Sequence, residues 1–317
     1  MLGRADVSEW DLVIVGGGPA GLTSALYGAR GGLSTLVLEQ RTAGGYLVEI
    51  PLVENYPGFS EGVAGMDLAA RMTEQAKKAG AELHEIELVE SIARKDRVFN
   101  VKTDRAEYCC GALILATGTV RRPLGVKGED EFKGRGVSYC ALCDGAFFKG
   151  KRVAVAGGGN SAAASALYLA GIASQVYLIH RRSEFRAEEA MVKPVRGRGV
   201  QFLLNTEILE LKGEGKLRSI VIRNKGSGQV SEVEVDGFFV EAGEVPNNKL
   251  AQGLELKLNE QGYIMVDECQ ATSVPGIFAA GDITHCSTKQ ISTAVGQGAV
   301  AATEAYCYLR QPYYRRK

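Results

Sequence analysis

Several features that assign a chain to a common protein class are missing from this sequence. No stretch approaches the roughly 18 consecutive apolar residues of a membrane-spanning helix. The first ten residues include Arg4, Asp6 and Glu9, so they lack the apolar core of a secretory signal peptide. Residues 314–317 match no lipidation or retention signal. We therefore expect a protein without a membrane partner.

An excess of charge of either sign is also absent. The chain has 37 Lys and Arg residues and 37 Asp and Glu residues, for a formal net charge of zero. A nucleic-acid binder normally carries a basic excess, so we expect no nucleic-acid partner. Seven cysteines are an odd number and too few for a secreted disulfide scaffold, which indicates a reducing cytoplasm. Three scattered histidines make a histidine-based metal site unexpected.

Glycine, in contrast, is abundant. Forty glycines are about 13% of the chain (40/317), against an average near 7%. They follow no collagen-like period and cluster where buried strands would turn into helices. At roughly 150 residues per domain, 317 residues correspond to two domains.

The first glycine cluster follows a short apolar run, residues 12–15, that is typical of a buried parallel strand. The cluster reads Gly16-Gly17-Gly18-Pro19-Ala20-Gly21, and a helical stretch to about residue 30 and a second strand over 35–38 follow it. In such a G-x-G-x-x-G turn the backbone can approach a pyrophosphate, whose charge the helix N-terminus stabilises. Glu39 lies 23 residues after Gly16 (39 − 16) and would accept hydrogen bonds from ribose hydroxyls. One fingerprint alone can be structural, but this context predicts a dinucleotide site.

The same plan recurs 141 residues later (157 − 16). A strand over 153–156 leads into Gly157-Gly158-Gly159-Asn160-Ser161-Ala162, then a helix to about residue 170 and a strand over 176–179. Alanine in the third fingerprint position is an allowed variant. His180 lies 23 residues after Gly157 (180 − 157), where the first copy has Glu39. Two copies of one unit predict two nucleotide-binding domains of the same fold.

The second copy differs in the charge at its second strand end. His180, Arg181 and Arg182 stand there, and Arg186 follows one helical turn later. A solvated basic turn would explain such residues, but guanidinium groups also pair bidentately with a 2′-phosphate, which a carboxylate would repel. The first site therefore favours an unmodified ribose and the second a phosphorylated one. FAD and NADP(H) are the simplest pair of cofactors.

Alternating, strand-rich sequence follows each copy, over about 85–110 and 201–241. The last third has one more buried strand and turn over 275–282, then a long helix over about 290–309. We expect this end of the chain to return and complete the first domain.

Cys140-Ala141-Leu142-Cys143 lies just before the second glycine cluster. A lone C-x-x-C can be half a zinc site, two buried cysteines or a redox dithiol. Zinc would need two more ligands, which no second C-x-x-C or nearby histidine supplies, so we expect no metal. The spacing suits a reversible disulfide, and the adjacent Asp144 could shuttle a proton. Because the motif lies between two expected dinucleotide sites, we favour the interpretation as a redox dithiol.

Over nearly its full length the chain resembles the low-molecular-weight thioredoxin reductase family. The matching blocks are residues 16–21, 53–58, 116–118, 134–145, 157–162, 180–186 and 281–282. The resemblance implies a homodimeric α/β flavoprotein with two Rossmann-like, three-layer ββα domains. An NADP(H) domain over 122–249, which carries the dithiol, would be inserted into an FAD domain over 1–121 and 250–317.

The resemblance also implies roles for single residues. Cys143 would face the flavin, Cys140 would attack the disulfide of thioredoxin or a thioredoxin-like protein, and Asp144 would be the acid. Further flavin contacts would come from Gly45, Tyr46, Leu47, Asn55, Ala116, Thr117, Gly118, Gly281, Asp282, Lys289, Gln290 and Ile291.

The sequence departs from the family pattern in two places. The family commonly has glutamine where Tyr46 stands, followed by threonines that are missing here, and this could shift the flavin potential. Glu241 and Glu244 add acidic groups near the expected domain junction.

We predict an NADPH-dependent, FAD-containing disulfide reductase that acts on thioredoxin. One alternative is a reductase on the same scaffold that takes electrons from ferredoxin or a deazaflavin. Another is a small-molecule dithiol oxidase. Neither of these needs the arginines after His180. A non-catalytic NADP(H)-binding redox sensor is the alternative from another class, and the intact C-x-x-C-Asp motif argues against it.

Overall fold

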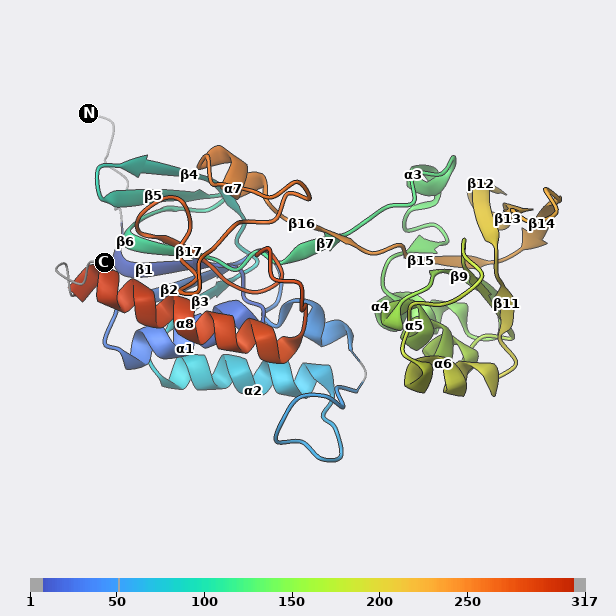
Figure 1. Ribbon diagram of the computed structural model, residues 1–317, viewed down its shortest axis with the longest axis horizontal. Coiled ribbons are helices and arrows are strands. Elements are labelled where there is room, and N and C mark those ends of the chain that lie inside the picture. The colour runs from blue at the N-terminus through green and yellow to red at the C-terminus, as the bar shows by residue number, and fades with distance from the viewer. Residues whose placement is uncertain (1–7, 51, 311–317) are drawn as a thin grey trace. The chain divides into compact units, whose positions relative to one another are not determined.

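The computed structural model describes residues 8–50 and 52–310. Arg4, Asp6 and residues 314–317, used above, lie outside the described residues. The chain forms two compact units (Figure 1). Unit 1 is built from the chain up to Val120 and again from Val245 onward, and unit 2 is the continuous segment Arg121–Glu244. Unit 2 is therefore an insertion within unit 1.

The second crossing between the units precedes the expected boundary at residue 249 by five residues (249 − 244). The Asn247 N–H donates to the Gly118 carbonyl at 3.0 Å, and the Asn248 side chain donates to the Gly262 carbonyl at 2.7 Å. These bonds tie both asparagines to unit 1. At the crossings, β7 (Thr119–Arg121) pairs with β16 (Glu244–Pro246) in a two-stranded sheet.

A seven-stranded sheet forms the centre of unit 1, in the order β3-β2-β1-β6-β5-β4, with β17 also paired to β6. The pairs among β3, β2, β1, β6 and β17 are parallel, whereas β4, β5 and β6 are antiparallel. The strands are β1 (Ser8–Val15), β2 (Thr35–Glu39), β3 (Glu82–Glu85), β4 (Val89–Lys95), β5 (Val98–Thr103), β6 (Glu107–Leu115) and β17 (Ile277–Ala279).

Both faces of β1 are buried, as its continuous apolar sequence indicated. Leu12 and Ile14 pack in one core cluster with alanines of the helices, while Val13 and Val15 pack in another with Phe99 of β5. The helices α1 (Pro19–Arg30), α2 (Gly65–Lys78) and α8 (Ile291–Arg310) lie along one face of the sheet (Figure 1). The other helical segments in the described part of unit 1 are η1 (Gly45–Glu49) and α7 (Lys249–Gly253).

The C-terminal helix α8 belongs to unit 1, so the chain returns to its first domain, as expected from the sequence. A Cβ on Gly298 of α8 would lie 2.3 Å from the Ala20 carbonyl oxygen, so only glycine allows the observed approach of α8 to α1. The Ser24 hydroxyl donates to the Gly298 carbonyl at 3.0 Å and fixes this contact.

Unit 2 repeats the architecture on a smaller scale. Its parallel sheet has the order β11-β10-β9-β15-β8, and a separate antiparallel sheet has the order β12-β13-β14. The elements are α3 (Glu129–Phe132), β8 (Val137–Ser138), α4 (Ala141–Asp144), η2 (Gly145–Phe148), β9 (Arg152–Gly157), α5 (Asn160–Ala170), β10 (Gln175–Ile179), α6 (Glu189–Arg196), β11 (Gln201–Leu203), β12 (Thr206–Glu214), β13 (Lys216–Asn224), β14 (Val230–Glu234) and β15 (Gly237–Glu241).

The side chains of successive β9 residues point to opposite faces of the parallel sheet and pack in different core clusters of unit 2. Val153 and Val155 share a core cluster with Ala166 of α5, whereas Ala154 and Ala156 share one with residues of β12 and β13. Helices, parallel sheet and antiparallel sheet thus form three layers. The prediction of two Rossmann-like α/β domains is confirmed.

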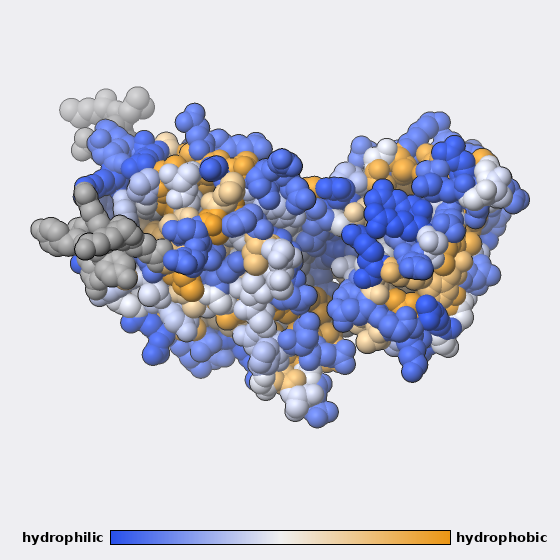
Figure 2. Space-filling model, in the orientation of Figure 1, coloured by the Kyte–Doolittle hydropathy of each residue, from blue (hydrophilic) through white to orange (hydrophobic). Residues whose placement is uncertain are grey.

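Hydrophilic residues cover much of the visible surface of each unit, with apolar residues interspersed (Figure 2). Within residues 8–50 and 52–310, no helix combines the length and the apolar character that crossing a bilayer requires.

Candidate dinucleotide sites and redox dithiol

The first glycine cluster forms a tight turn between β1 and α1. Gly16 has a φ of +108°, and a Cβ there would lie 2.3 Å from the Ala116 carbonyl oxygen. A second glycine pair rests on this turn: the Gly44 N–H donates to the Gly17 carbonyl at 2.7 Å, and a Cβ on Gly45 would lie 3.2 Å from Gly18 Cα. Two bare backbone segments thus meet at the N-terminus of α1. This cradle fits a dinucleotide pyrophosphate.

Glu39 lies beside this turn at the end of β2, and its side chain is buried. Its Oε2 accepts the Gly17 N–H at 2.6 Å, and its Oε1 accepts the Arg41 N–H at 2.8 Å. These bonds fix the carboxylate next to the glycine backbone. A carboxylate has about four acceptor sites, so it can also accept ribose hydroxyls.

Hydrogen bonds join several other predicted flavin contacts within unit 1. The Asn55 amide donates to Gln290 Oε1 at 3.2 Å, which joins two segments far apart in sequence. Lys289 Nζ donates to the carbonyls of Asp282, at 3.0 Å, and Thr284, at 2.5 Å. The Thr117 hydroxyl donates to the Asn247 carbonyl at 2.9 Å.

The remaining predicted flavin contacts of unit 1 differ in their surroundings. The Leu47 side chain is buried in a small core cluster with Val53 and Leu68, and Tyr46 is half-buried. The Gly281 N–H donates to Gln297 Oε1 at 2.7 Å, and Gly118 has a φ of +62°. Ile291 begins α8 and packs against the same cluster as Leu47.

The second glycine turn lies between β9 and α5. A Cβ on Gly157 would lie 2.5 Å from the Glu241 carbonyl oxygen, whereas one on Gly159 would meet no protein atom within 4 Å. The Gly158 carbonyl accepts the N–H groups of Arg186, at 2.7 Å, and Ala187, at 3.1 Å. The basic segment after β10 is thereby folded onto the turn.

The four basic residues of that segment do not share one environment. Arg181, Arg182 and Arg186 are exposed, but His180 is buried beneath the glycine turn. Its ring stacks on Phe185 with 5.5 Å between centroids, and its Nε2 has no hydrogen-bond partner. Burial, followed by the charges of Arg182 and Arg186, lowers the pKa of His180. The structure thus gives His180 a packing position that its place in the motif did not reveal.

Two predicted contacts at the start of α5 also have distinct surroundings. The Asn160 side chain donates to Glu188 Oε1 at 2.9 Å and accepts the Glu188 N–H at 2.8 Å. It therefore fastens the segment before α6 to the glycine turn. Ser161 is exposed, and Ala162 is buried in the core of unit 2.

Cys140 and Cys143 form a disulfide, with 5.4 Å between their Cα atoms. Cys140 caps α4, and its Sγ accepts the Cys143 N–H at 3.1 Å. Cys143 is exposed, whereas Cys140 is half-buried. A C-x-x-C on the first turn of a helix suits a reactive dithiol because the helix N-terminus stabilises a thiolate.

Ser138 connects the dithiol to Asp144, a contact for which the sequence gave no signal. Its hydroxyl donates to Asp144 Oδ2 at 2.6 Å and accepts the Cys140 N–H at 3.0 Å. Ser138 is buried in β8. The carboxylate is therefore fixed in the same hydrogen-bonded turn as the first cysteine.

Three of the other described cysteines, Cys109, Cys110 and Cys307, are poor nucleophiles. Burial raises the pKa of Cys110 to about 12. Burial also raises the pKa values of Cys109 and Cys307, with smaller contributions from nearby glutamates. These three thiols remain protonated at neutral pH. The redox assignment rests on Cys140 and Cys143, which form the disulfide.

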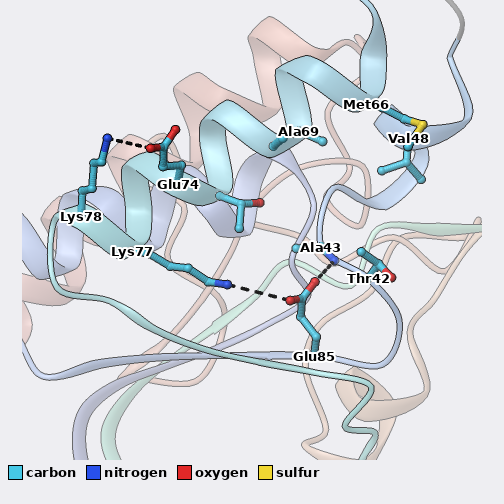
Figure 3. A pocket seen from close by; sticks show the side chains of 11 residues that line it. Thr42, Ala43, Val48, Met66, Ala69, Glu74, Lys77, Lys78 and Glu85 are labelled. Atoms are coloured by element: carbon cyan, nitrogen blue, oxygen red, sulfur yellow. Dashed lines mark hydrogen bonds and ion pairs between the residues drawn. The ribbon is translucent and has the colours of Figure 1, made fainter.

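Unit 1 also has a cavity of about 640 Å³ beside α2, lined by residues that include Met66, Ala69 and Val48 (Figure 3). Ion pairs lie at its edge: Lys78 with Glu74 at 2.7 Å, and Lys77 with Glu85 at 3.9 Å. None of the residues predicted from the sequence as site residues lines this cavity.

Residues 10–298 match the family model for pyridine nucleotide-disulphide oxidoreductases. The thioredoxin reductase of Bacillus subtilis is 42% identical over 304 residues, which cover 95% of each chain. A crystal structure of Lactococcus lactis thioredoxin reductase is 38% identical, covers 95% of this chain and 99% of that chain, and has a TM-score of 0.91. The T. acidophilum thioredoxin reductase structure is 39% identical, with 95% and 98% coverage and a TM-score of 0.90. The chain therefore belongs to the pyridine nucleotide-disulphide oxidoreductases and, among them, to the low-molecular-weight thioredoxin reductase family.

Proposed function

We propose that the protein reduces the disulfide of thioredoxin, or of a thioredoxin-like protein, with electrons from NADPH. The observation that carries this proposal is a disulfide, Cys140–Cys143, in a unit that has its own dinucleotide turn and exposed arginines. Unit 1 is the proposed FAD domain and unit 2 the proposed NADP(H) domain. When bound, FAD would supply the two-electron link between NADPH and the disulfide.

The dithiol chemistry follows from ordinary thiol–disulfide exchange. After two-electron reduction, the Cys140 thiolate would attack one sulfur of the partner disulfide and form a mixed disulfide, while the other partner sulfur leaves as a thiolate. Cys143 would then attack Cys140, releasing the second partner thiolate and restoring the Cys140–Cys143 disulfide. Two electrons and two protons reach the partner. Asp144, held by Ser138, is the proposed proton donor.

The arginines after β10 support NADPH rather than NADH as the electron donor. Arg181, Arg182 and Arg186 are exposed on a segment that two hydrogen bonds to the Gly158 carbonyl hold at the glycine turn. A 2′-phosphate has a charge near −2, and such charges pair strongly with guanidinium groups. His180, buried and with a lowered pKa, would contribute through packing rather than as a cation.

Three further properties belong to the proposal. We propose a homodimer, which light scattering can test, because the family resemblance implies one. The low cysteine count supports a cytoplasmic location. Neither the balanced charge nor the motifs indicate a nucleic-acid or membrane partner.

The deciding experiment measures NADPH oxidation coupled to thioredoxin reduction by the FAD-loaded protein. We expect Cys140→Ser and Cys143→Ser each to abolish thioredoxin reduction, because exchange needs both sulfurs, while NADPH still bleaches the flavin absorbance. Cys307→Ser is the matched control and should keep full activity. NADPH that fails to bleach the flavin of the wild type would instead favour a ferredoxin- or deazaflavin-linked reductase. If either dithiol variant reduced thioredoxin at the wild-type rate, the dithiol assignment would be wrong.

A further inference from the structure

Glu241, whose position near the domain junction the sequence left unexplained, lies at the mouth of the second dinucleotide site. It ends β15 and stands in parallel register with Gly157, the first glycine of the turn. A Cβ on Gly157 would lie 3.0 Å from the Glu241 Cβ. The strand order β11-β10-β9-β15-β8 reverses between β9 and β15. Ligands of doubly wound sheets bind at the carboxyl ends of the strands at such a reversal.

The Glu241 carboxylate is part of a charged network inside unit 2. Its Oε2 accepts from Arg121 Nη1 at 2.8 Å, and its Oε1 accepts from the Ser165 hydroxyl of α5 at 2.6 Å. Only 5% of the Glu241 side chain and 20% of the Arg121 side chain are exposed. A buried ion pair is often no more stabilising than apolar residues of the same volume. Its presence at a ligand-binding edge therefore suggests a role in recognition.

The direction of a bound dinucleotide follows from the turn and the arginines. The pyrophosphate lies at the N-terminus of the helix after the glycine turn, here α5. The 2′-phosphate of the adenosine half belongs with the exposed arginines that follow β10, on one side of β9. The nicotinamide half would then extend to the other side of β9, toward the end of β15 and Glu241.

We propose that Arg121 and Glu241 recognise the carboxamide group of the nicotinamide half of NADP(H). A carboxamide has a carbonyl acceptor and an NH₂ donor, and a guanidinium–carboxylate pair offers the complementary donor and acceptor. Arg121 donates to the carbonyl oxygen and Glu241 accepts from the NH₂ group. The inference rests on the proposed function, because it requires NADP(H) in unit 2. It assigns specificity for the nicotinamide ring to residues distinct from the arginines that select the 2′-phosphate.

Calorimetric titration of the full-length, FAD-loaded protein tests this inference with two ligands. NADP⁺ has both halves of the cofactor, and adenosine 2′,5′-bisphosphate lacks the nicotinamide half. In the double variant Arg121→Ala/Glu241→Ala, which removes both members of the ion pair, the Kd of NADP⁺ should rise roughly 10- to 100-fold, as expected for lost hydrogen bonds to charged groups. The Kd of the bisphosphate should stay unchanged, which also shows that unit 2 is folded. Arg181→Ala/Arg182→Ala is the matched contrast and should weaken both ligands.

A third ligand tests the acceptor role of Glu241 by itself. The 3-acetylpyridine analogue of NADP⁺ has a methyl group in place of the carboxamide NH₂. The wild type should bind it more weakly than NADP⁺. Glu241→Gln should weaken NADP⁺ binding and reduce its preference over the analogue, because glutamine has one acceptor oxygen where the carboxylate has two. Equal loss of affinity for NADP⁺ and the bisphosphate in the double variant would mean that the Arg121–Glu241 pair is purely structural. Unchanged NADP⁺ binding in both the double variant and Glu241→Gln would also overturn the inference. A wild type that binds none of the ligands would instead refute the proposed function.

Discussion

The packing of His180 under the second glycine turn makes Gly158→Ala a demanding test of how this turn is built. An alanine Cβ would lie 2.2 Å from Cε1, 2.3 Å from Nδ1 and 2.6 Å from Nε2 of the His180 ring. The ring cannot move away at low cost, because it is buried and stacked on Phe185. Overpacking of this kind costs about 1–3 kcal/mol. We also expect weaker NADP⁺ binding, since the Gly158 carbonyl holds the segment of Arg186.

Gly159→Ala is the control for this prediction. Its Cβ would meet no protein atom within 4 Å, and its φ of −105° suits any residue. Its stability should therefore match the wild type within about 0.5 kcal/mol, as for most substitutions away from packed features. NADP⁺ binding should nevertheless fall, because the middle glycine of the fingerprint lets the backbone approach the pyrophosphate. Gly158→Ala should thus lose both folding stability and affinity for NADP⁺, whereas Gly159→Ala should lose affinity alone.

The assay is chemical unfolding followed by far-ultraviolet circular dichroism, combined with calorimetric NADP⁺ binding. Fluorescence is unsuitable for unit 2, because the single tryptophan, Trp10, belongs to unit 1. Adding His180→Ala to Gly158→Ala opens space for the new methyl group, so the two changes should couple favourably by about 1–3 kcal/mol. Wild-type stability of Gly158→Ala, or purely additive effects in the double variant, would refute the proposed packing.

Three further predictions concern the two cofactor sites. Arg181→Ala/Arg182→Ala should raise the KM for NADPH by roughly 10- to 1000-fold, because each lost phosphate contact is worth about 1.5–3 kcal/mol. The KM for NADH should stay almost unchanged. If steady-state kinetics showed equal increases in both KM values, the arginines would have a structural role. The pKa of His180 is lowered from its ordinary value of 6.5, so the unfolded chain takes up this proton first, and stability should fall as the pH drops below 6.5. Thermal melting of His180→Gln should show a smaller decline over that range, and an identical decline would contradict the assignment. Glu39→Ala should lower the flavin content of the purified protein, because it removes the proposed ribose acceptor and leaves the Gly17 N–H without its 2.6 Å partner; an undiminished flavin spectrum would count against the first site.

The sequence was most informative where one residue type has few structural uses. The two glycine turns and the strands before them could be predicted because parallel strands buried on both faces are continuously apolar, as residues 12–15 are. The C-terminal return to unit 1 followed from a third strand-and-turn pattern. The C-x-x-C before the second glycine turn could be predicted to be a redox dithiol, because no further zinc ligands accompany it in the sequence.

Contacts between distant residues were not predictable. The burial of His180 depends on the space above Gly158, and nothing in the basic motif distinguishes it from the exposed arginines. The Asn160 side chain donates a hydrogen bond to Glu188, 28 residues later in the chain, a partner that the glycine motif does not indicate. The contact of Ser138 with Asp144 and the position of Glu241 beside Gly157 exist only in the folded sheet, where β15 pairs with β8 and β9. Spacing along the chain specifies turns and strand ends, but side-chain partners depend on the three-dimensional packing.

The paired crossing strands β7 and β16 have a consequence for how this protein could evolve. The chain enters and leaves unit 2 through two hydrogen-bonded neighbours, so the ends of the 124-residue segment 121–244 (244 − 120) are adjacent. A segment of this size with its own core clusters can behave as a module. Gene exchange could replace it whole without disturbing the sheet of unit 1. Such an exchange would carry the proposed NADP(H) site and the Cys140–Cys143 disulfide. The proposed donor site and the disulfide would then be inherited together.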